Sequence, residues 1–188
     1  MRSLTSFIVT SLDGFYEGPK GELDWSIVDE EFNEFTVRQL DQADTLGFGR
    51  LTYEHMAAYW PTEQAKVNDR AITSRMNDME KLVFATTLTQ ADWSPTTVIH
   101  SDAIDHLPTI KSAAGGELLV LGSAQLTAHL IRAGLLDELR MMVCPIVLGQ
   151  GRSPFKDLED PVSLLLLSVR QFDSGNLLLT YRPTRHPS

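Results

Sequence analysis

The sequence predicts an α/β protein with a mostly parallel sheet, helices on its faces and an antiparallel hairpin at one edge. Up to about residue 135, short apolar runs alternate with segments of helical spacing, which is typical of parallel strands joined by helices. In the last third, three strand-like runs follow one another. The last two are separated by Asp173-Ser174-Gly175-Asn176, a hairpin turn signal. Consecutive strands of this kind pair antiparallel, so the hairpin should close the sheet at an edge.

The strands predicted in the first hundred residues are short apolar, β-branched runs: residues 4–10, 45–49, 81–85 and 97–99. Residues 29–40 repeat apolar side chains at helical spacing and have carboxylates in the first turn, where the helix dipole favours them. A second helix begins after Gly49 and stops at Trp60-Pro61, and a further helical segment covers 66–78. Residues 15–28 predict a loop around Trp25, which either docks on the core or covers a ligand.

The second half repeats the unit of strand, glycine and helix before its character changes. We expect a helix over 104–113, a strand over 117–121 that ends at Gly122-Ser123, and a helix over 124–131 that Gly134 terminates. The strand-like runs that follow cover 138–148, 162–172 and 177–181. A chain of 188 residues has the length of one domain, so we expect a single domain over 1–188.

The net charge of −9 argues against polyanionic partners. With 16 Lys and Arg against 25 Asp and Glu, the chain is repelled by nucleic acids and by anionic membranes, and we expect neither as a partner. The acidity is concentrated in residues 1–64, which hold 12 acidic and 4 basic residues. A multiply phosphorylated substrate would therefore bind poorly in this first third.

Several kinds of chemistry lack the residues they need. The five histidines form neither an HExxH motif nor a close pair with cysteine, so we expect no metal. The single cysteine, Cys144, lies in an apolar run before Pro145 and is interpreted as a buried, inert thiol. There is no GxSxG motif of a nucleophilic hydrolase. We see no N-terminal leader and no apolar run of about 18 residues, and we expect a cytoplasmic protein.

Two junctions between a strand and a helix are candidates for binding phosphate. Ligands of open α/β sheets bind beyond the carboxyl ends of strands, where Gly49-Arg50 and Gly122-Ser123 stand. Glycine allows a ligand to approach, and the free N–H groups of a helix start attract an anion. Arg50, Thr52 and Ser123 add side-chain donors, and two such sites suit a dinucleotide. Alternatively both glycines only make tight turns, since neither segment is a GxGxxG or GxxxxGK[ST] motif.

Four motifs occur in order across nearly the whole chain. They are Ser11-Leu12-Asp13-Gly14, Gly49-Arg50-x-Thr52-Tyr53-Glu54, Gly122-Ser123-x-x-Leu126, and Gly134-Leu135-Leu136-Asp137-Glu138-Leu139-Arg140 with downstream Pro145-Ile146-Val147-Leu148-Gly149-x-Gly151 and Phe155. Together they resemble the dihydrofolate-reductase-like superfamily. The resemblance is closer to the reductase domain of bifunctional riboflavin-biosynthesis deaminase/reductases and their stand-alone relatives, and the last motif is the most diagnostic.

The resemblance implies a three-layer α/β/α sandwich with a mixed sheet and NADPH as the hydride donor. It also implies cofactor contacts at matching positions. Those at the 2′-phosphate and pyrophosphate side are Gly49, Arg50 and Thr52, with Thr86 and Thr87 near the ribose. Those of a second pyrophosphate turn are Gly122, Ser123 and Ala124. Asp13 and Gly14 would open the loop beside the nicotinamide and the substrate.

The sequence departs from the family at Ser123, where relatives often have a second glycine and where the Cβ restricts close approach. Dihydrofolate reductases have a substrate-binding carboxylate five residues after a loop tryptophan, a spacing that leads from Trp25 to Glu30. Glu30 would bind an aminopyrimidine edge and help to protonate a reduced C=N, or the acids at 29–31 only stabilise the helix start. Asp13 is either a substrate contact or a turn former, and Arg152 either binds a substrate phosphate or is solvated.

We expect an NADPH-dependent reductase of a small pyrimidine- or pteridine-like heterocycle, resembling the 5-amino-6-(5-phosphoribosylamino)uracil reductase of riboflavin biosynthesis. The alternative enzyme is dihydrofolate reductase. The alternative of another class is a non-catalytic, ligand-binding dimer that retains the fold. The apolar runs 141–144 and 164–167 indicate strands buried on both faces, either central in the sheet or at an edge that pairs with a second copy. Because the riboflavin-type relatives are commonly dimers, we expect a homodimer.

Overall fold

The computed structural model describes residues 1–184. Their elements, in chain order, are β1 (Leu4–Ser11), α1 (Glu30–Gln42), β2 (Ala43–Gly49), α2 (Arg50–Tyr59), α3 (Glu63–Asn68), α4 (Arg70–Asp78), β3 (Glu80–Phe84), β4 (Thr96–Ile99), α5 (Ala103–Ser112), β5 (Glu117–Leu121), α6 (Ala124–Arg132), β6 (Glu138–Cys144), β7 (Ser163–Gln171) and β8 (Leu177–Thr184).

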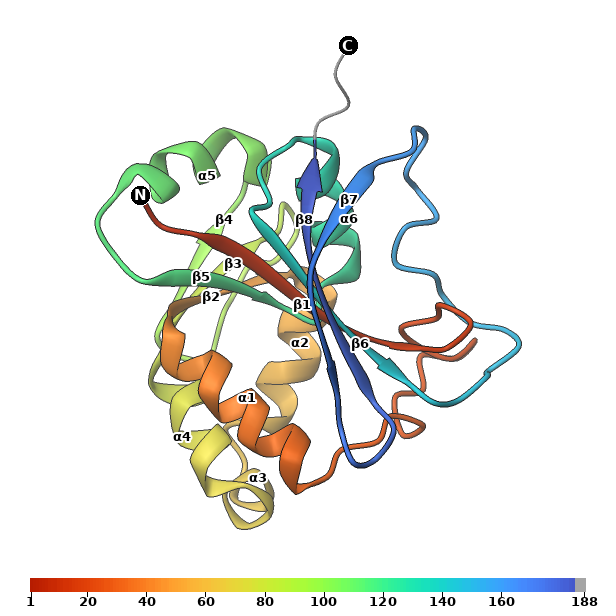
Figure 1. The fold of residues 1–188 in the computed structure, drawn as a ribbon. Helices are drawn as coiled ribbons and strands as arrows, with labels where there is room; N and C mark the ends of the chain where they lie inside the picture. Colours follow the sequence, from red (N-terminus) through yellow and green to blue (C-terminus); the bar gives the residue numbers. More distant parts are fainter. Residues whose placement is uncertain (185–188) are drawn as a thin grey trace.

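The strands form one eight-stranded sheet in the order β4-β3-β2-β5-β1-β6-β8-β7. From β4 to β6 all neighbours are parallel, whereas β8 pairs antiparallel with both β6 and β7. The hairpin between β7 and β8 turns at residues 173–176, as the sequence predicts. The predicted mixed sheet with a closing antiparallel hairpin is thus confirmed (Figure 1).

Helices cover both faces of the parallel part of the sheet, which gives the three predicted layers (Figure 1). On one face, the aromatic side chains of Phe7, Phe35 and Phe48 pack with residues of α1, α2 and α4. On the other face, α5 and α6 cover Leu4 and Ile8 of β1 and the residues of β5 that point to the same side of the sheet. Alternate residues of the same strand therefore enter different cores, as the period of two in a strand requires.

Side chains cap the starts of four helices. Asp29, Thr62, Asp69 and Asp102 each accept a hydrogen bond from a backbone N–H in the first turn of α1, α3, α4 and α5. In the described chain only α2 and α6 begin without such a cap. Their first N–H groups therefore remain available to another acceptor.

Two details differ from the expectations, and one open alternative is decided. The strand predicted over 138–148 ends at Cys144, because Pro145 has no N–H to continue the ladder. The helical segment predicted over 66–78 is two helices, separated at Asp69. Of the two positions considered for the run 164–167, the structure shows the edge of the sheet, since β7 is the last strand in the order.

Candidate active site

A step in the edge of the sheet marks the candidate site. β5 pairs with β1 only as far as Phe7 and Leu121, whereas β6 accompanies β1 to Ser11 and Cys144. The segment Ile8–Ser11 therefore extends past the end of β5 with no strand on that side. In the sheet, β2 lies on one side of β1 and β6 lies on the other side. β1 is therefore at the topological switch point, where open α/β sheets bind ligands.

The two uncapped helix starts meet beside this step. Gly122 has the positive φ of +67° and donates its N–H to the carbonyl of Phe7, at 2.9 Å. Ser123 is buried, and its Oγ accepts the N–H of Gly49 at 3.1 Å instead of capping its own helix. The predicted phosphate-binding junctions at Gly49 and Gly122 are thus brought together, and the N-termini of α2 and α6 form one region of positive potential.

The side chains predicted around these junctions lie at the same edge with different partners. Arg50 is half-exposed, and its Nη1 lies 3.0 Å from both carboxylate oxygens of Glu54. Its guanidinium would have to leave Glu54 to reach a phosphate. The Thr52 methyl group borders Gly122, Ala124 is buried at the start of α6, and Thr86 and Thr87 are exposed just after β3.

The Asp13 carboxylate binds the loop that follows β6. Its Oδ1 accepts the Ser11 hydroxyl at 2.7 Å and the N–H of Leu148 at 3.1 Å, and its Oδ2 accepts the N–H of Gly149 at 2.7 Å. The Ser11 hydroxyl, followed by these backbone groups, holds the pKa of Asp13 below its usual value. Gly14, at φ +84°, completes the turn. Asp13 therefore positions the loop as a carboxylate; its predicted contact with substrate stays a prediction.

A second connection joins the same two loops. Glu17 and Arg152 form an isolated antiparallel bridge, in which the Arg152 N–H donates to the Glu17 carbonyl and the Tyr16 N–H donates to the Arg152 carbonyl, each at 2.9 Å. Arg152 Nη1 also lies 3.0 Å from Glu17 Oε1. Glu17 is 7% exposed, so its carboxylate is one of the few buried charges in this region. Arg152, predicted as a phosphate contact or a solvated residue, is thus partnered to Glu17 inside the loop pair.

The acids at the start of α1 have different surroundings. Asp29 caps the helix through the N–H of Phe32, and Glu31 binds Arg170 and the N–H of Asp173, which lower its pKa. Glu30 is exposed, and within residues 1–184 no hydrogen bond or ion pair engages its carboxylate. Of the three carboxylates, Glu30 is the one left for a ligand. Trp25 is half-exposed and donates from Nε1 to the carbonyl of Glu22 at 2.9 Å.

Removal of the Asp13 carboxylate should release the loop after β6. Asp13→Ala is expected to raise the amide exchange rates of Leu148 and Gly149 at least about 10-fold, because both N–H groups lose their charged acceptor. Hydrogen–deuterium exchange with mass spectrometry measures this, with the exposed Asp24→Ala as the matched control. The wild-type loop should also loosen as the pH falls through the lowered pKa of Asp13. Equal exchange in both variants would contradict the loop-holding role.

Sequence reasoning missed three features of the site. The buried Glu17 left no recognisable pattern, because its pairing with Arg152 depends on which loops meet in space, whereas the Glu54 partner of Arg50 follows from the i,i+4 spacing within one helix. The step between β1 and β5 depends on strand register, which the apolar pattern alone does not specify.

Solved structures share the architecture. A protein of Shewanella sp. PV-4, whose description assigns it to riboflavin biosynthesis, superposes with a TM-score of 0.75 at 22% identity. The superposition covers 97% of this chain and 99% of that chain. A deaminase/5-amino-6-(5-phosphoribosylamino)uracil reductase of Thermotoga maritima gives 0.67 at 12% identity, over 97% of this chain and 57% of that one. Dihydrofolate reductase of Enterococcus faecalis, complexed with NADP(H), gives 0.60 at 16% identity, over 97% of each chain. The fold is that of the dihydrofolate-reductase-like proteins.

The family is shown by the sequence comparisons. The family model for the RibD C-terminal domain matches residues 2–178. Uncharacterized protein YyaP of Bacillus subtilis is 30% identical over 176 residues, which are 93% of this chain and 91% of that protein, and YwjB of the same organism is 27% identical over 174 residues, which are 91% and 92%. The chain belongs to the RibD C-terminal domain family, which confirms the resemblance and supports a reductase of the RibD type.

Other features of the described residues concern membranes, metals and the thiol. No helix within 1–184 has the length and apolar character needed to span a bilayer. In the same residues His, Cys, Asp and Glu nowhere gather in threes as a metal site would require. His186 lies outside the described part. Cys144 is buried, and that burial raises the pKa of its thiol.

Proposed function

We propose that this protein is an NADPH-dependent reductase of a small pyrimidine- or pteridine-like heterocycle. The observation that carries the proposal is the meeting of two uncapped helix starts, α2 and α6, at the step between β5 and β1. A dinucleotide has the two phosphate loci that this pair of N-termini suits, and its reactive ring can then reach the exposed edge of β1.

The residues around the junctions fit the phosphates of such a cofactor. A Cβ added at Gly49 would have Leu126 as its nearest neighbour, at 4.0 Å, so the space in front of the α2 start is open. Gly122 presents its backbone without a side chain at the start of α6. Thr86, Thr87 and Arg50 follow the neighbouring strands β3 and β2 and would contact a 2′-phosphate, for which Arg50 would exchange Glu54.

NADPH would supply the hydride, and the chain's own residues would bind the cofactor, orient the substrate and protonate it. The helix starts of α2 and α6 would fix the phosphates, and the part of β1 that extends past the end of β5 would offer a backbone edge to a flat heterocycle. The loops after β1 and β6, which are joined by Asp13 and by Glu17–Arg152, would border the substrate. Glu30 would help to bring a proton to the substrate nitrogen.

Titration with NADPH tests the cofactor step. We expect quenching or enhancement of the nicotinamide fluorescence and an increase in Tm with NADPH, because a ligand that binds only the folded state stabilises it. A flat titration together with no thermal shift would overturn the proposal and favour a non-catalytic protein that retains the fold.

Assays with two substrates test the reductase step. NADPH oxidation with 5-amino-6-(5-phosphoribosylamino)uracil and with dihydrofolate separates the RibD-type reading from dihydrofolate reductase. For whichever substrate turns over, Glu30→Gln should lower kcat/KM at least about 10-fold and leave NADPH affinity unchanged, since general acid–base groups typically contribute 10²–10⁴-fold. Glu34→Gln, an exposed acid of the same helix, is the matched control. Equal kcat/KM in both variants would show that Glu30 only stabilises the helix start.

A further inference from the structure

An ion pair lies at the helix start that is proposed for the cofactor phosphates. Arg50 is the first residue of α2, and Glu54 lies one turn further along the helix. Arg50 Nη1 is 3.0 Å from both carboxylate oxygens of Glu54, and the two side chains are 41% and 42% exposed. Exposed pairs of this kind contribute little to stability. Arg50 can therefore exchange Glu54 for another anion at small cost.

Few charges lie at the edge of the sheet where α2 begins. The segments that follow the neighbouring strands β3, β2 and β5 are 85–91, 49–59 and 122–126, and Arg50 and Glu54 are the only Lys, Arg, Asp or Glu in them. The ends of β2 and β3 are paired in register, so the chain leaves both strands at the same level of this edge. Recognition of a charged group here thus depends on one cation and one carboxylate.

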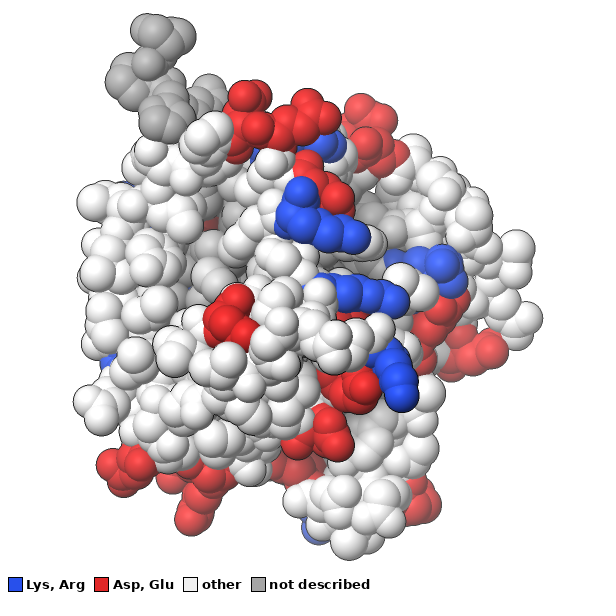
Figure 2. Space-filling model, turned by 90° about the vertical axis from the view of Figure 1, so that its right-hand side faces the viewer, with Lys and Arg blue, Asp and Glu red and all other residues white. Residues whose placement is uncertain are grey.

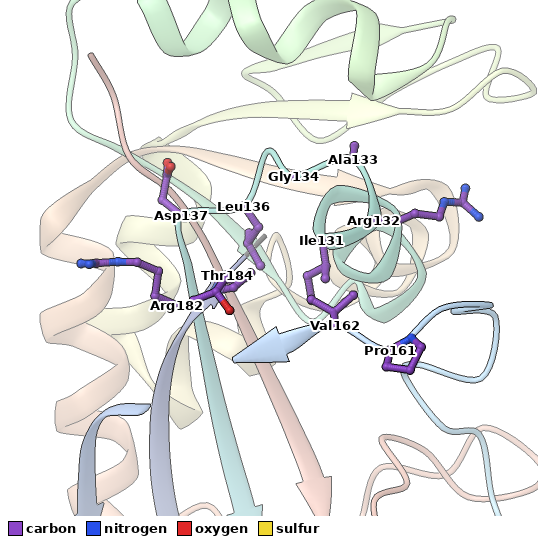
Figure 3. A pocket seen from close by; sticks show the side chains of 11 residues that line it. Ile131, Arg132, Ala133, Gly134, Leu136, Asp137, Pro161, Val162, Arg182 and Thr184 are labelled. Atoms are coloured by element: carbon purple, nitrogen blue, oxygen red, sulfur yellow. The ribbon is translucent and has the colours of Figure 1, made fainter. Parts of the chain in front are cut away.

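A cavity of about 520 Å³ lies at the other end of α6 and has arginines of its own. Figure 3 shows Ile131, Leu136 and Val162 at its centre, with the guanidinium groups of Arg132 and Arg182 pointing outward in opposite directions. The carboxyl end of a helix also carries a negative partial charge, which disfavours a phosphate. These arginines therefore neither converge on one anion nor lie near the start of α6.

The overall charge of the protein does not attract a phosphate either. The net charge is −9, and on the face shown in Figure 2 basic side chains lie among acidic ones. In the loops and the hairpin near the candidate site, Arg152 is paired with Glu17 and Arg170 is paired with Glu31. Affinity for one more phosphate group should therefore be decided locally, by the ion pair at the start of α2.

NADPH and NADH differ in one group that this ion pair can distinguish. NADPH carries a phosphate on the adenosine 2′-oxygen, where NADH has a hydroxyl. In dinucleotide sites an arginine accommodates the 2′-phosphate, whereas an acidic side chain accepts a hydrogen bond from the 2′-hydroxyl. Here both kinds of side chain lie one helical turn apart. A 2′-phosphate has to displace Glu54 from Arg50 and is then repelled by the freed carboxylate, but a 2′-hydroxyl can donate to that carboxylate.

We propose that Glu54 is a specificity-determining residue that reduces the preference of this site for NADPH over NADH. Glu54 competes with the 2′-phosphate for Arg50 and offers an acceptor to the 2′-hydroxyl, so the two dinucleotides bind to opposite members of the same ion pair. The site should therefore bind NADH as well as NADPH. This role rests on the proposed function, because it requires a dinucleotide at the start of α2.

Fluorescence titration of the wild type and of Glu54→Gln with NADPH and with NADH tests this role. The substitution should lower the dissociation constant of NADPH about 5-fold and should leave that of NADH unchanged or raise it, because only the 2′-phosphate gains from a free Arg50. Glu63→Gln is the matched control, since Glu63 is an exposed acid that is also paired within its helix, with Lys66. It should change neither dissociation constant.

Arg50→Gln gives a second readout. It should weaken the binding of NADPH at least about 10-fold, because the phosphate loses a charged donor, and should change the binding of NADH little. The rise in Tm with each dinucleotide should follow the same order, and circular dichroism confirms that the variants are folded.

Three outcomes would each overturn the role of Glu54: equal factors for both dinucleotides in Glu54→Gln, an unchanged dissociation constant for NADPH in that variant, or a wild type that binds only NADPH. A wild type that binds neither dinucleotide would overturn the proposed function itself, and the role of Glu54 with it.

Discussion

Gly49→Asp should make the folded protein more stable and its binding of NADPH at least about 10-fold weaker, a difference of about 1.4 kcal/mol. Gly49 is the N-cap of α2 and has extended backbone angles, φ −81° and ψ 164°, that any residue adopts without strain. An aspartate there would cap the free N–H groups and place a negative charge at the positive end of the helix, which together stabilise by about 0.5 kcal/mol. The same carboxylate would occupy the position proposed for a cofactor phosphate and would repel that phosphate.

Two further substitutions separate the causes. Gly49→Asn caps the helix without a charge, so it should keep the gain in Tm and lose less affinity for NADPH. Gly49→Ala adds only the Cβ, which meets Leu126 at ordinary contact distance, and should change both quantities little. Thermal unfolding and fluorescence titration of the three variants measure this. If Gly49→Asp gained stability and still bound NADPH as tightly as Gly49→Ala, the helix start would not be the phosphate site.

The fold could be predicted because its signals are local. The first helix shows its apolar spacing and its Asp29 cap in the sequence, and the hairpin shows its turn residues at 173–176. The end of β6 was harder to predict. The apolar run continues to Leu148, but Pro145 and the Asp13 carboxylate turn residues 145–149 into a loop. Asp13 is distant in sequence, so no local pattern could show it.

The positions of the candidate site residues could be predicted from the sequence, but the contacts that these residues make with one another were not predicted. Gly49 and Gly122 follow separate strands, and only the insertion of β5 between β2 and β1 makes their helices neighbours. The pairing of Arg50 with Glu54 was available from the i,i+4 spacing on a helix and was not used. The edge position of β7 could not be distinguished from a central one, because a run of leucines is equally apolar in both.

Among the described residues, the most deeply buried cation is Lys81, which lies at the opposite end of the sheet from the candidate site. Lys81 lies two residues before Val83 in β3, so the alternation of side chains along a strand puts both on the same buried face. The sequence already contained this pattern. The side chain has no solvent exposure, and its Nζ donates to the carbonyls of Asn77 at 3.0 Å and Met79 at 2.6 Å, with the ring of Trp93 4.5 Å away. It thus satisfies carbonyls at the end of α4. Burial lowers its pKa from 10.5 to about 8.

This burial should make the stability of the protein rise with pH. Between pH 8 and 10.5 the unfolded chain binds a proton at Lys81 that the folded chain has lost, so the free energy of unfolding increases through that range. Over the whole window the gain is about 3 kcal/mol, since one unit of pKa corresponds to about 1.36 kcal/mol. Below pH 8 both states are protonated and the contribution of Lys81 is flat.

Lys81→Met removes the titrating group and isolates this effect from the other groups that ionise at high pH. Urea unfolding at intervals from pH 7 to 10.5 should give a difference in stability, wild type minus Lys81→Met, that grows with pH by about 3 kcal/mol. Lys66→Met, at an exposed position of α3, controls for the loss of one lysine. A difference that stays constant across the range would mean that Lys81 is charged to the same extent in both states. Because Lys81 lies at the amino end of β3, NADPH binding at the carboxyl ends of β2 and β5 should be unchanged in Lys81→Met.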